Sequence, residues 1–348
     1  MQVWIDDHEV AATAFTVQGR GVEAGRPRDL RQALKAATRG LLGRRRASAA
    51  RAPGGGAAAV VGKEGGVLVR QDGDEVTLTA HAAGDPRPVV EAVEATLLRL
   101  QPREVRLAGA LEGGVSPWRP YMAEGALFVR IVHRRESAFQ TIEVGEHPVY
   151  GRMLFLNGET QIATSDEPLY SASLVDPVVG PETRRVCVLG GGDCGVLRQV
   201  LNHPVEEVVM AEIDAAVVEV AAEFFPGVVA GVREDPRARI VLGDALEALE
   251  ETAPGSFDLV IYDLSDAPLE DATFDRLGRL VHRALAPQGR VAVQCGSALP
   301  RSAKQLRGNL AGLAQHFARV KTREVVIPSF LRQPWVFAAA RRRADEPA

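Results

Sequence analysis

The chain has 348 residues, of which 46% are hydrophobic and 25% are charged, and its net charge at pH 7 is −4. This length allows two or three domains, and the composition is that of a soluble globular protein and not of a disordered chain. The charge is unevenly spread, because residues 160–275 hold 23 acidic and 6 basic side chains whereas residues 1–51 hold 10 basic and 5 acidic ones. So acidic a segment argues against nucleic acid and anionic membranes as partners, and it favours a cationic ligand.

The chain offers no sign of a metal site or a membrane segment. Its three cysteines, Cys187, Cys194 and Cys295, give neither a disulfide framework nor a CxxC metal spacing. The N-terminus lacks the basic residues and the apolar core of a signal peptide, and no run of 18 apolar residues occurs. We therefore expect a cytoplasmic protein without metal.

Residues 1–112 predict a small α+β domain. Short strands are expected within residues 1–17, followed by a helix over residues 27–43. The Arg/Ala/Gly-rich stretch 44–56 predicts a flexible basic loop. Three strands (57–61, 65–71, 75–82), a helix (85–102) and a further strand (104–110) complete the expected order.

Residues 113–176 predict a β-hairpin subdomain, with alternating strands over 125–134, 139–146 and 151–163 and Gly/Asn turns. Residues 177–348 differ in pattern. Apolar strand runs at spacings of about 20–30 residues alternate with helix patterns, which is typical of a Rossmann-like, doubly wound parallel α/β sheet.

A glycine-rich loop follows the first strand of that sheet. Gly190, Gly192 and Gly195 satisfy G-x-G-x-x-G, and Glu212 lies 22 residues beyond Gly190, where a carboxylate would bind ribose hydroxyls. Glu212 could also be an ordinary surface residue at a strand end. A nicotinamide dehydrogenase would share both features, but Asp193 inside the loop would repel a pyrophosphate. The loop therefore favours an adenosyl ligand with a positive charge, such as S-adenosylmethionine or a relative.

Further carboxylates follow the later strands. Asp244 could accept from an adenine amino group or cap the next helix, and Asp263 lies at a carboxyl strand end, where open α/β sheets bind ligands. Asp266 could bind a ligand or cap a helix. Asp166 and Tyr170 lie where the hairpins meet the sheet domain, a common place for a ligand site, although a structural role is an alternative for each.

The segments GRMLFLNGETQIATSDEPLY, VCVLGGGDCGVLRQVLNHPVEEVVMAEID, VLGDALEAL and IYDLSDAP, in this order and spacing, resemble the polyamine aminopropyltransferases. The resemblance covers about residues 137–340 and, within the family, is greatest to the spermine synthases. Residues 1–112 resemble the S-adenosylmethionine-decarboxylase-like domain that precedes catalysis in those enzymes, which implies a homodimer built through this domain.

The resemblance implies a role for each site residue. Asp193 would hold the primary amine of decarboxylated S-adenosylmethionine and Glu212 its ribose, while Asp263 would take the proton of the acceptor amine beside Tyr170. The implied donor-binding set is Gln140, Gln161, Gly190, Gly192, Asp193, Glu212, Asp214 and Asp244. The implied acceptor-binding set is Asp166, Tyr170, Asp263 and Asp266. The catalytic set is Asp263, Tyr170 and Asp193.

Three departures from the family pattern stand out. Cys194 replaces the usual glycine of GGGDGG, and the segment from Asp266 to Pro268 is shorter than the D-P-x-G-P loop of spermidine synthases. In IPSFLRQPWVF, Phe330 stands where a tyrosine is usual, and Arg332 with Gln333 stands where spermine synthases offer an acid. The last change bears on which polyamine is the acceptor.

The implied reaction is displacement at carbon with a neutral thioether leaving, so it needs no cofactor or metal and no covalent protein nucleophile. We expect aminopropyl transfer to a polyamine, with spermidine as the first choice of acceptor and spermine as product. Putrescine as acceptor, or thermospermine as product, is the alternative. A small-molecule methyltransferase and a non-catalytic polyamine-binding protein are the other classes considered.

Overall fold

The computed structural model describes residues 2–5, 8–11, 14–20, 32, 34–35, 46–52, 55–61, 65–82, 87–100, 104–108, 119–120, 129–147, 150–264, 271–299, 302–330 and 333–343. The chain folds into two compact units. The first comprises Met1–Arg135, Thr141–Ala163 and Pro328–Arg332, and the second comprises Glu136–Gln140, Thr164–Ile327 and Gln333–Ala348. The predicted hairpin strands thus belong mostly to the first unit, and the predicted division of the chain at residues 112 and 176 stays a prediction.

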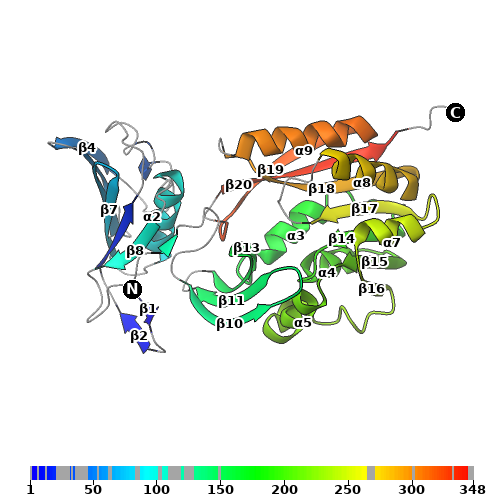
Figure 1. Cartoon of the computed structure of the whole chain (residues 1–348), viewed down its shortest axis with the longest axis horizontal. Helices are drawn as coiled ribbons and strands as arrows, with labels where there is room; N and C mark the ends of the chain where they lie inside the picture. Colours follow the sequence, from blue (N-terminus) through cyan, green and yellow to red (C-terminus); the bar gives the residue numbers. More distant parts are fainter. Residues whose placement is uncertain are drawn as a thin grey trace. The chain divides into compact units, whose positions relative to one another are not determined.

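The N-terminal part of the first unit is a seven-stranded antiparallel sheet with the order β4-β5-β6-β7-β3-β8-β9 (Figure 1). Its strands are β3 (Ala14–Arg20), β4 (Arg46–Ala52), β5 (Gly55–Val61), β6 (Gly65–Asp72), β7 (Glu75–Ala82), β8 (Glu104–Ala108) and β9 (Arg119–Pro120). A separate hairpin pairs β1 (Gln2–Ile5) with β2 (His8–Ala11). Helix α2 (Arg87–Leu100) packs on β6 and β7. The predicted α+β pattern is confirmed for these segments, and the helix expected over 27–43 lies mostly outside the described residues.

The predicted loop over residues 44–56 is wrong. Most of this stretch lies in β4 and β5, which pair along their whole length from Arg46–Val61 to Ala52–Gly55. Alanine and glycine are poor strand formers, so the sequence pattern alone favoured a loop. Pairing of β5 with β6, and burial of Ala58 and Val60 at alternate positions, outweigh that weak local preference.

The hairpin sheet of the first unit has the order β10-β11-β12-β13 (Figure 1). Its strands are β10 (Arg130–Glu136), β11 (Thr141–His147), β12 (Gly151–Leu156) and β13 (Glu159–Ala163), as the alternating pattern predicts. The two-residue turn between β12 and β13 is Asn157-Gly158, and both residues have positive φ, 51° and 82°. Asn-Gly is the sequence that such a turn favours.

A buried pair links helix α2 to the hairpin sheet within the first unit. His147 Nε2 lies 3.2 Å from Glu94 Oε1, and both side chains are nearly inaccessible to solvent. His147 Nδ1 accepts a hydrogen bond from the Tyr150 backbone N–H, so the proton on the ring belongs to Nε2 and points to Glu94. The imidazole also stacks on the Tyr150 ring at 4.4 Å.

The second unit is a seven-stranded sheet with the order β16-β15-β14-β17-β18-β20-β19 and helices on both faces (Figure 1). Its strands are β14 (Arg185–Gly190), β15 (Glu207–Glu212), β16 (Ala238–Leu242), β17 (Phe257–Asp263), β18 (Leu285–Ser297), β19 (Phe317–Ile327) and β20 (Gln333–Arg342). The pairs among β14–β18 are parallel, and β20 is antiparallel to both of its neighbours. The predicted Rossmann-like α/β sheet is confirmed, with an antiparallel strand that the pattern did not predict.

Seven helices in the described part of the chain accompany this sheet. They are α3 (Glu167–Val175), α4 (Gly195–Leu201), α5 (Ala215–Phe224), α6 (Pro226–Val229), α7 (Ala245–Glu251), α8 (Asp271–Ala284) and α9 (Ala303–His316). Helix α3 contacts α4, and α6 contacts both α4 and α5. Helix α8 contacts both α7 and α9. No described helix is both long enough and apolar enough to cross a bilayer.

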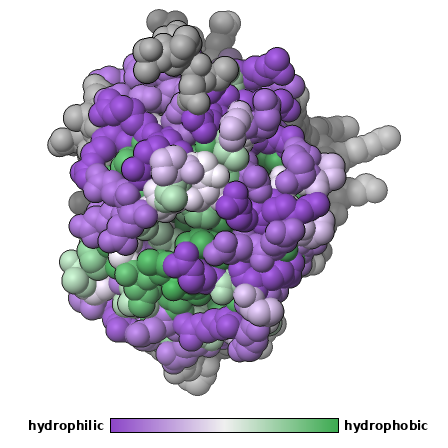
Figure 2. All heavy atoms as spheres, turned by 90° about the vertical axis from the view of Figure 1, so that its right-hand side faces the viewer, coloured by the Kyte–Doolittle hydropathy of each residue, from purple (hydrophilic) through white to green (hydrophobic). Residues whose placement is uncertain are grey.

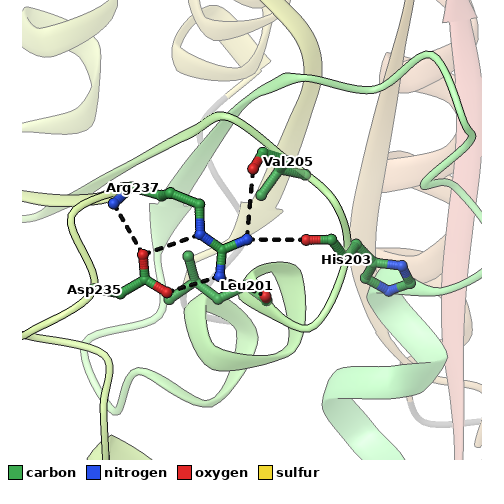
Figure 3. Close-up of polar contacts among 5 residues, drawn as sticks. All are labelled: Leu201, His203, Val205, Asp235 and Arg237. Carbon is green, nitrogen blue, oxygen red and sulfur yellow. Dashed lines mark hydrogen bonds and ion pairs between the residues drawn. The ribbon is translucent and has the colours of Figure 1, made fainter.

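The side chain of Arg237 forms hydrogen bonds that link the loops at the amino ends of β15 and β16 (Figure 3). The Arg237 guanidinium donates to both oxygens of Asp235, at 3.0 and 2.7 Å, and to the carbonyl oxygens of Leu201, His203 and Val205. Leu201 is the last residue of α4, so one side chain joins a helix end to two loops. This pairing lowers the pKa of Asp235 and raises that of Arg237.

Candidate functional site

The predicted carboxylates gather at the carboxyl edge of the parallel strands. In register, Gly190 at the end of β14 pairs with Asp263 at the end of β17, and Glu212 at the end of β15 pairs with Leu242 of β16. Parallel strands bring their carboxyl ends to one edge of the sheet, which is where such folds bind ligands. The expectation that Asp193, Glu212 and Asp263 share one edge therefore holds.

The glycines of the loop are required by close approach of the site carboxylates. A Cβ at Gly190, whose φ is 79°, would lie 2.4 Å from the Asp263 carbonyl oxygen, and a Cβ at Gly192 would lie 2.9 Å from Glu212 Oε2. Neither position has room for a side chain. The loop therefore packs directly against the ends of β15 and β17.

Cys194 adopts a left-handed conformation, with φ 68° and ψ 6°, at the N-cap of α4. A non-glycine residue in this region is strained by roughly 1–2 kcal/mol. This conformation explains physically why the family usually has glycine at this position. The Cys194 side chain is fully buried, and burial raises the pKa of its thiol to about 12, so the thiol is protonated and is no nucleophile.

Asp193 is held at the tip of the loop by the backbone. Its Oδ1 accepts a hydrogen bond of 2.8 Å from the Gly195 N–H. The pKa of Asp193 is raised to about 6, chiefly by burial; the hydrogen bond from Gly195 opposes this rise, and the nearby carboxylates of Glu167 and Glu212 contribute to it. A half-buried carboxylate in such surroundings is stabilised by an incoming cation.

Glu212 ends β15, and Asp214 lies two residues further along, at the N-cap of α5. Glu212 is 9% exposed, its Oε1 accepts 2.9 Å from the Asp214 N–H, and burial raises its pKa. Asp214 caps α5 through Ala216 and accepts 2.9 Å from Gln140 Nε2 and 2.7 Å from Ser137 Oγ. Two predicted donor-binding residues, Gln140 and Asp214, thus bind each other, and Ser137, which the sequence analysis missed, completes the group.

Asp244 caps helix α7, because its Oδ1 accepts 2.7 Å from the Leu246 N–H. The capping interpretation is thereby confirmed, and it leaves a ligand role open at the same strand edge.

Asp263 and Tyr170 meet directly. The Tyr170 hydroxyl donates to Asp263 Oδ1 at 2.8 Å, and the Tyr170 ring packs edge-on against Phe337 at 5.2 Å. Tyr170 comes from α3 and Asp263 from β17, 93 residues later. The structure therefore brings the two predicted acceptor-side residues into one hydrogen-bonded pair.

The other predicted residues are placed as follows. Asp166 precedes α3, is 6% exposed, and its backbone carbonyl accepts from the N–H groups of Leu169 and Tyr170. Gln161 lies on β13 of the first unit, where its Nε2 donates to the Glu159 carbonyl at 3.2 Å. Asp266 lies outside the described residues.

Two charged residues beside the loop were missed by sequence reasoning. Glu167 is 3% exposed and binds Arg198 of α4 at 2.6 Å between Oε2 and Nη2. An acidic residue in the first turn of a helix is common, so the sequence carried no signal that this one is buried.

The uncharged residue Gln294 of β18 was also missed by the sequence analysis. Its Nε2 donates 2.7 Å to the Leu264 carbonyl, which follows Asp263.

A hollow of about 360 Å³ starts at the amino-terminal edge of the sheet, at Arg185 and Glu207, and continues along β15 and β16 as far as Ala211 and Val241. Its floor includes Cys187, Val209, Val241 and Phe257, and Figure 2 shows an apolar surface within a hydrophilic rim on this side. The site carboxylates Asp193, Glu212, Asp244 and Asp263 do not line this hollow.

The strand order and the acidic carboxyl edge define an α/β enzyme of methyltransferase-like fold. Solved structures agree. The spermidine synthase from Thermotoga maritima aligns with a TM-score of 0.55 at 24% identity, over 62% of this chain and 73% of that chain. A spermidine synthase in complex with the transition-state analogue AdoDATO aligns with a TM-score of 0.58 at 24% identity, over 67% and 78%.

Sequence comparison identifies the family. The spermine/spermidine synthase domain matches residues 170–346, and the spermidine synthase tetramerisation domain matches residues 129–164. A polyamine aminopropyltransferase of Synechococcus sp. is 36% identical over 62% of this chain and 71% of that protein. Spermidine synthase 1 of Hyoscyamus niger is 37% identical over 53% of this chain and 59% of that protein. The chain belongs to the spermine/spermidine synthase family of transferases.

Proposed function

We propose that this protein transfers the aminopropyl group of decarboxylated S-adenosylmethionine to an amine of a polyamine, releasing 5′-methylthioadenosine. The observation that carries the proposal is the 2.8 Å hydrogen bond between Tyr170 and Asp263 at the carboxyl edge of the sheet. This bond joins Asp263, the candidate proton acceptor, to the aromatic side chain of Tyr170. Asp263 ends β17, which pairs with β14, the strand that the Asp193 loop follows. Family membership is consistent with this activity.

The donor side of the proposal is supported by the chemistry of the loop. A half-buried carboxylate at Asp193 disfavours a phosphate and favours an ammonium or sulfonium group. Glu212 has Oε1 engaged with the Asp214 N–H and lies against Gly192, as a carboxylate that accepts from ribose hydroxyls would. In this proposal Asp193 binds the donor's amine, Glu212 its ribose and Asp244 its adenine, with Gln140 and Asp214 bordering the group.

The chemistry proposed for the acceptor side is proton removal. A polyamine amine resembles lysine, with a pKa of about 10.4, so near neutral pH it carries a proton and cannot attack. Asp263 takes that proton as the nitrogen lone pair forms a bond to the aminopropyl carbon next to sulfur. The carbon–sulfur bond breaks and its electrons neutralise the sulfonium. Alignment of the two substrates supplies most of the remaining acceleration, and no metal or cofactor takes part.

The acceptor is a finer part of the proposal. We keep spermidine as the first candidate and spermine as its product, with Asp166 and Asp266 matching the further ammonium groups. The relatives named spermidine synthase favour spermidine as product instead, with putrescine as acceptor. Phe330, one of the departures from the family pattern, is buried. Arg332 lies outside the described residues.

The experiment offers putrescine and spermidine together, with either decarboxylated or intact S-adenosylmethionine, and identifies the products by mass. A polyamine one aminopropyl group longer, formed only with the decarboxylated donor, supports the proposal. A methylated amine formed only with the intact donor would establish a methyltransferase instead. The ratio of spermine to spermidine identifies the acceptor.

The assembly and the compartment belong to the same proposal. We propose an oligomer, for which a homodimer through residues 1–112 is the sequence-based expectation, while the match of residues 129–164 to a tetramerisation domain favours a tetramer. The mass of the full chain in solution decides between them. We propose the cytoplasm as the compartment, where the three free, buried cysteines would stay reduced.

A further inference from the structure

An ion pair with a buried carboxylate, Glu167, lies beside the loop that carries Asp193. Glu167, the first residue of α3, is 3% exposed, and its Oε2 accepts 2.6 Å from Arg198 of α4. Its Oε1 accepts 2.6 Å from the Ser171 hydroxyl one turn further along α3. Both carboxylate oxygens are therefore fixed, and the side chain has one orientation.

Glu167 reaches the loop at Gly195. A Cβ at Gly195 would lie 2.4 Å from Glu167 Oε1 and 3.0 Å from Asp193 Oδ1, so the two carboxylates border the same small space. The Gly195 N–H donates to Asp193 Oδ1 at 2.8 Å. The peptide that orients Asp193 is thus packed against the Glu167 carboxylate.

The Glu167–Arg198 ion pair is not well explained by a contribution to the stability of the fold. A buried ion pair rarely stabilises a fold more than apolar residues of the same size, because desolvation offsets most of the attraction. Helices α3 and α4 already contact each other and bury Leu174 and Leu197. A role in binding accounts for the pair better, since it places a fixed negative charge next to the group that is to hold a cation.

The charges around Asp193 come from several elements. Glu167 on α3 and Glu212 on β15 both raise the pKa of Asp193, and Arg198 on α4 faces Glu167. Asp263 on β17 borders the loop from the other side, with Oδ2 3.3 Å from a Cβ built at Gly191. Acidic groups therefore outnumber basic ones among these residues, and an ammonium group would reduce this excess of negative charge.

We propose that Glu167 is a positioning residue for the ammonium group of the donor. Held by Arg198 and Ser171, it fixes Asp193 through Gly195 and adds the negative potential that retains the cation. This inference rests on the proposed aminopropyl transfer. In it Glu167 contacts Gly195, whose N–H group orients Asp193, and does not contact the substrate.

The test compares two ligands that share the adenosyl group. Decarboxylated S-adenosylmethionine carries the ammonium arm and 5′-methylthioadenosine lacks it. In Glu167→Gln the amide oxygen still accepts from Ser171 but the charge is gone. By calorimetry we expect affinity for the decarboxylated donor to fall about tenfold while affinity for 5′-methylthioadenosine stays within about twofold. In turnover, KM for the donor rises and kcat changes little.

The pH dependence supplies a readout that a purely structural role would not move. Because the charge of Glu167 raises the pKa of Asp193, Glu167→Gln shifts the acid limb of donor binding to lower pH. Glu167→Asp retains the charge and is expected to recover most of the preference for the charged ligand. Glu250→Gln removes one carboxylate from an exposed pair with Arg276, at 2.5 Å, and should change neither affinity.

Distinct results overturn the inference and the proposed function. If the unaltered protein binds neither ligand, the proposed function fails and the inference falls with it. If the unaltered protein prefers the charged ligand and Glu167→Gln keeps the same preference, the inference alone is wrong. Should Glu167→Gln not fold, Ser171→Ala loosens Glu167 while keeping its charge, and a two- to threefold loss of preference is expected. An unchanged preference in that variant also overturns the inference.

Discussion

Replacing Asp263 by asparagine removes the proposed proton acceptor with little change in shape. Asp263 Oδ1 accepts the hydrogen bond of Tyr170, and an asparagine oxygen accepts it equally well, so the 2.8 Å contact survives. The variant then depends on acceptor molecules that arrive without a proton. For an amine of pKa about 10.4, about one molecule in a thousand is neutral at pH 7.4. We therefore expect kcat/KM for the acceptor to fall about 10³-fold, or about 4 kcal/mol.

The assay for Asp263→Asn is the pH dependence of kcat/KM for the acceptor between pH 7 and 10. The variant should gain about tenfold per pH unit as the free amine loses its proton, and the unaltered protein should rise far less steeply. Asp176→Asn, at an exposed aspartate that contacts His203, serves as the matched control and should keep full activity. Activity of Asp263→Asn within tenfold of the unaltered protein at pH 7.4, or a loss that persists at pH 10, would refute the role of Asp263.

Three further predictions concern the loop and the fold. Glu212→Gln keeps the hydrogen bond from the Asp214 N–H but loses the charge-assisted hydrogen bonds to ribose, so KM for the donor should rise about 10- to 100-fold at constant kcat. An unchanged donor affinity would show that Glu212 does not bind the ribose. Asp193, with its pKa raised from 3.8 to about 6, stabilises the fold fully below pH 3.8 and loses that contribution as pH rises through 6. Asp193→Asn should therefore increase the free energy of unfolding at pH 8 by up to about 3 kcal/mol, which raises the melting temperature there but not at pH 3.5. The same variant should lose donor binding. Equal melting temperatures of the variant and the unaltered protein at pH 8 would contradict this prediction. Arg237→Gln should lower the melting temperature and leave kcat/KM unchanged, because it removes the hydrogen bond from the loop before β16 to the Leu201 carbonyl. A variant as stable as the unaltered protein would show that this hydrogen bond is dispensable.

Much of the second unit could be predicted because its central strands β14, β15 and β17 are buried on both faces. Runs such as RVCVLG and FDLVIYD are continuous and apolar, and a carboxylate follows each strand where the chain reaches the sheet edge. Such a pattern specifies both the element and the edge to which its polar residues belong. For this reason the sequence pattern could predict that Asp193, Glu212 and Asp263 lie at one edge of the sheet.

The parts that could not be predicted depend on contacts between distant residues. Ser137 binds Asp214 across 77 residues, and Arg198 binds Glu167 across 31 residues, so neither pairing has a local signal. Strand β4 and the first two residues of β5 were missed because sequence rich in alanine and glycine has little intrinsic preference for strand, and only pairing of β4 with β5 and of β5 with β6 decides the outcome. The departure at Cys194 could be seen in the sequence, whereas its left-handed backbone could not.

The most direct test of the central claim measures two products in one reaction. The full chain is incubated with decarboxylated S-adenosylmethionine, with and without a polyamine, and 5′-methylthioadenosine and the extended polyamine are quantified together. The account predicts equal amounts of both, formed only when the polyamine is present and lost in Asp263→Asn. Release of 5′-methylthioadenosine without any extended polyamine, or no release with either putrescine or spermidine, would contradict it.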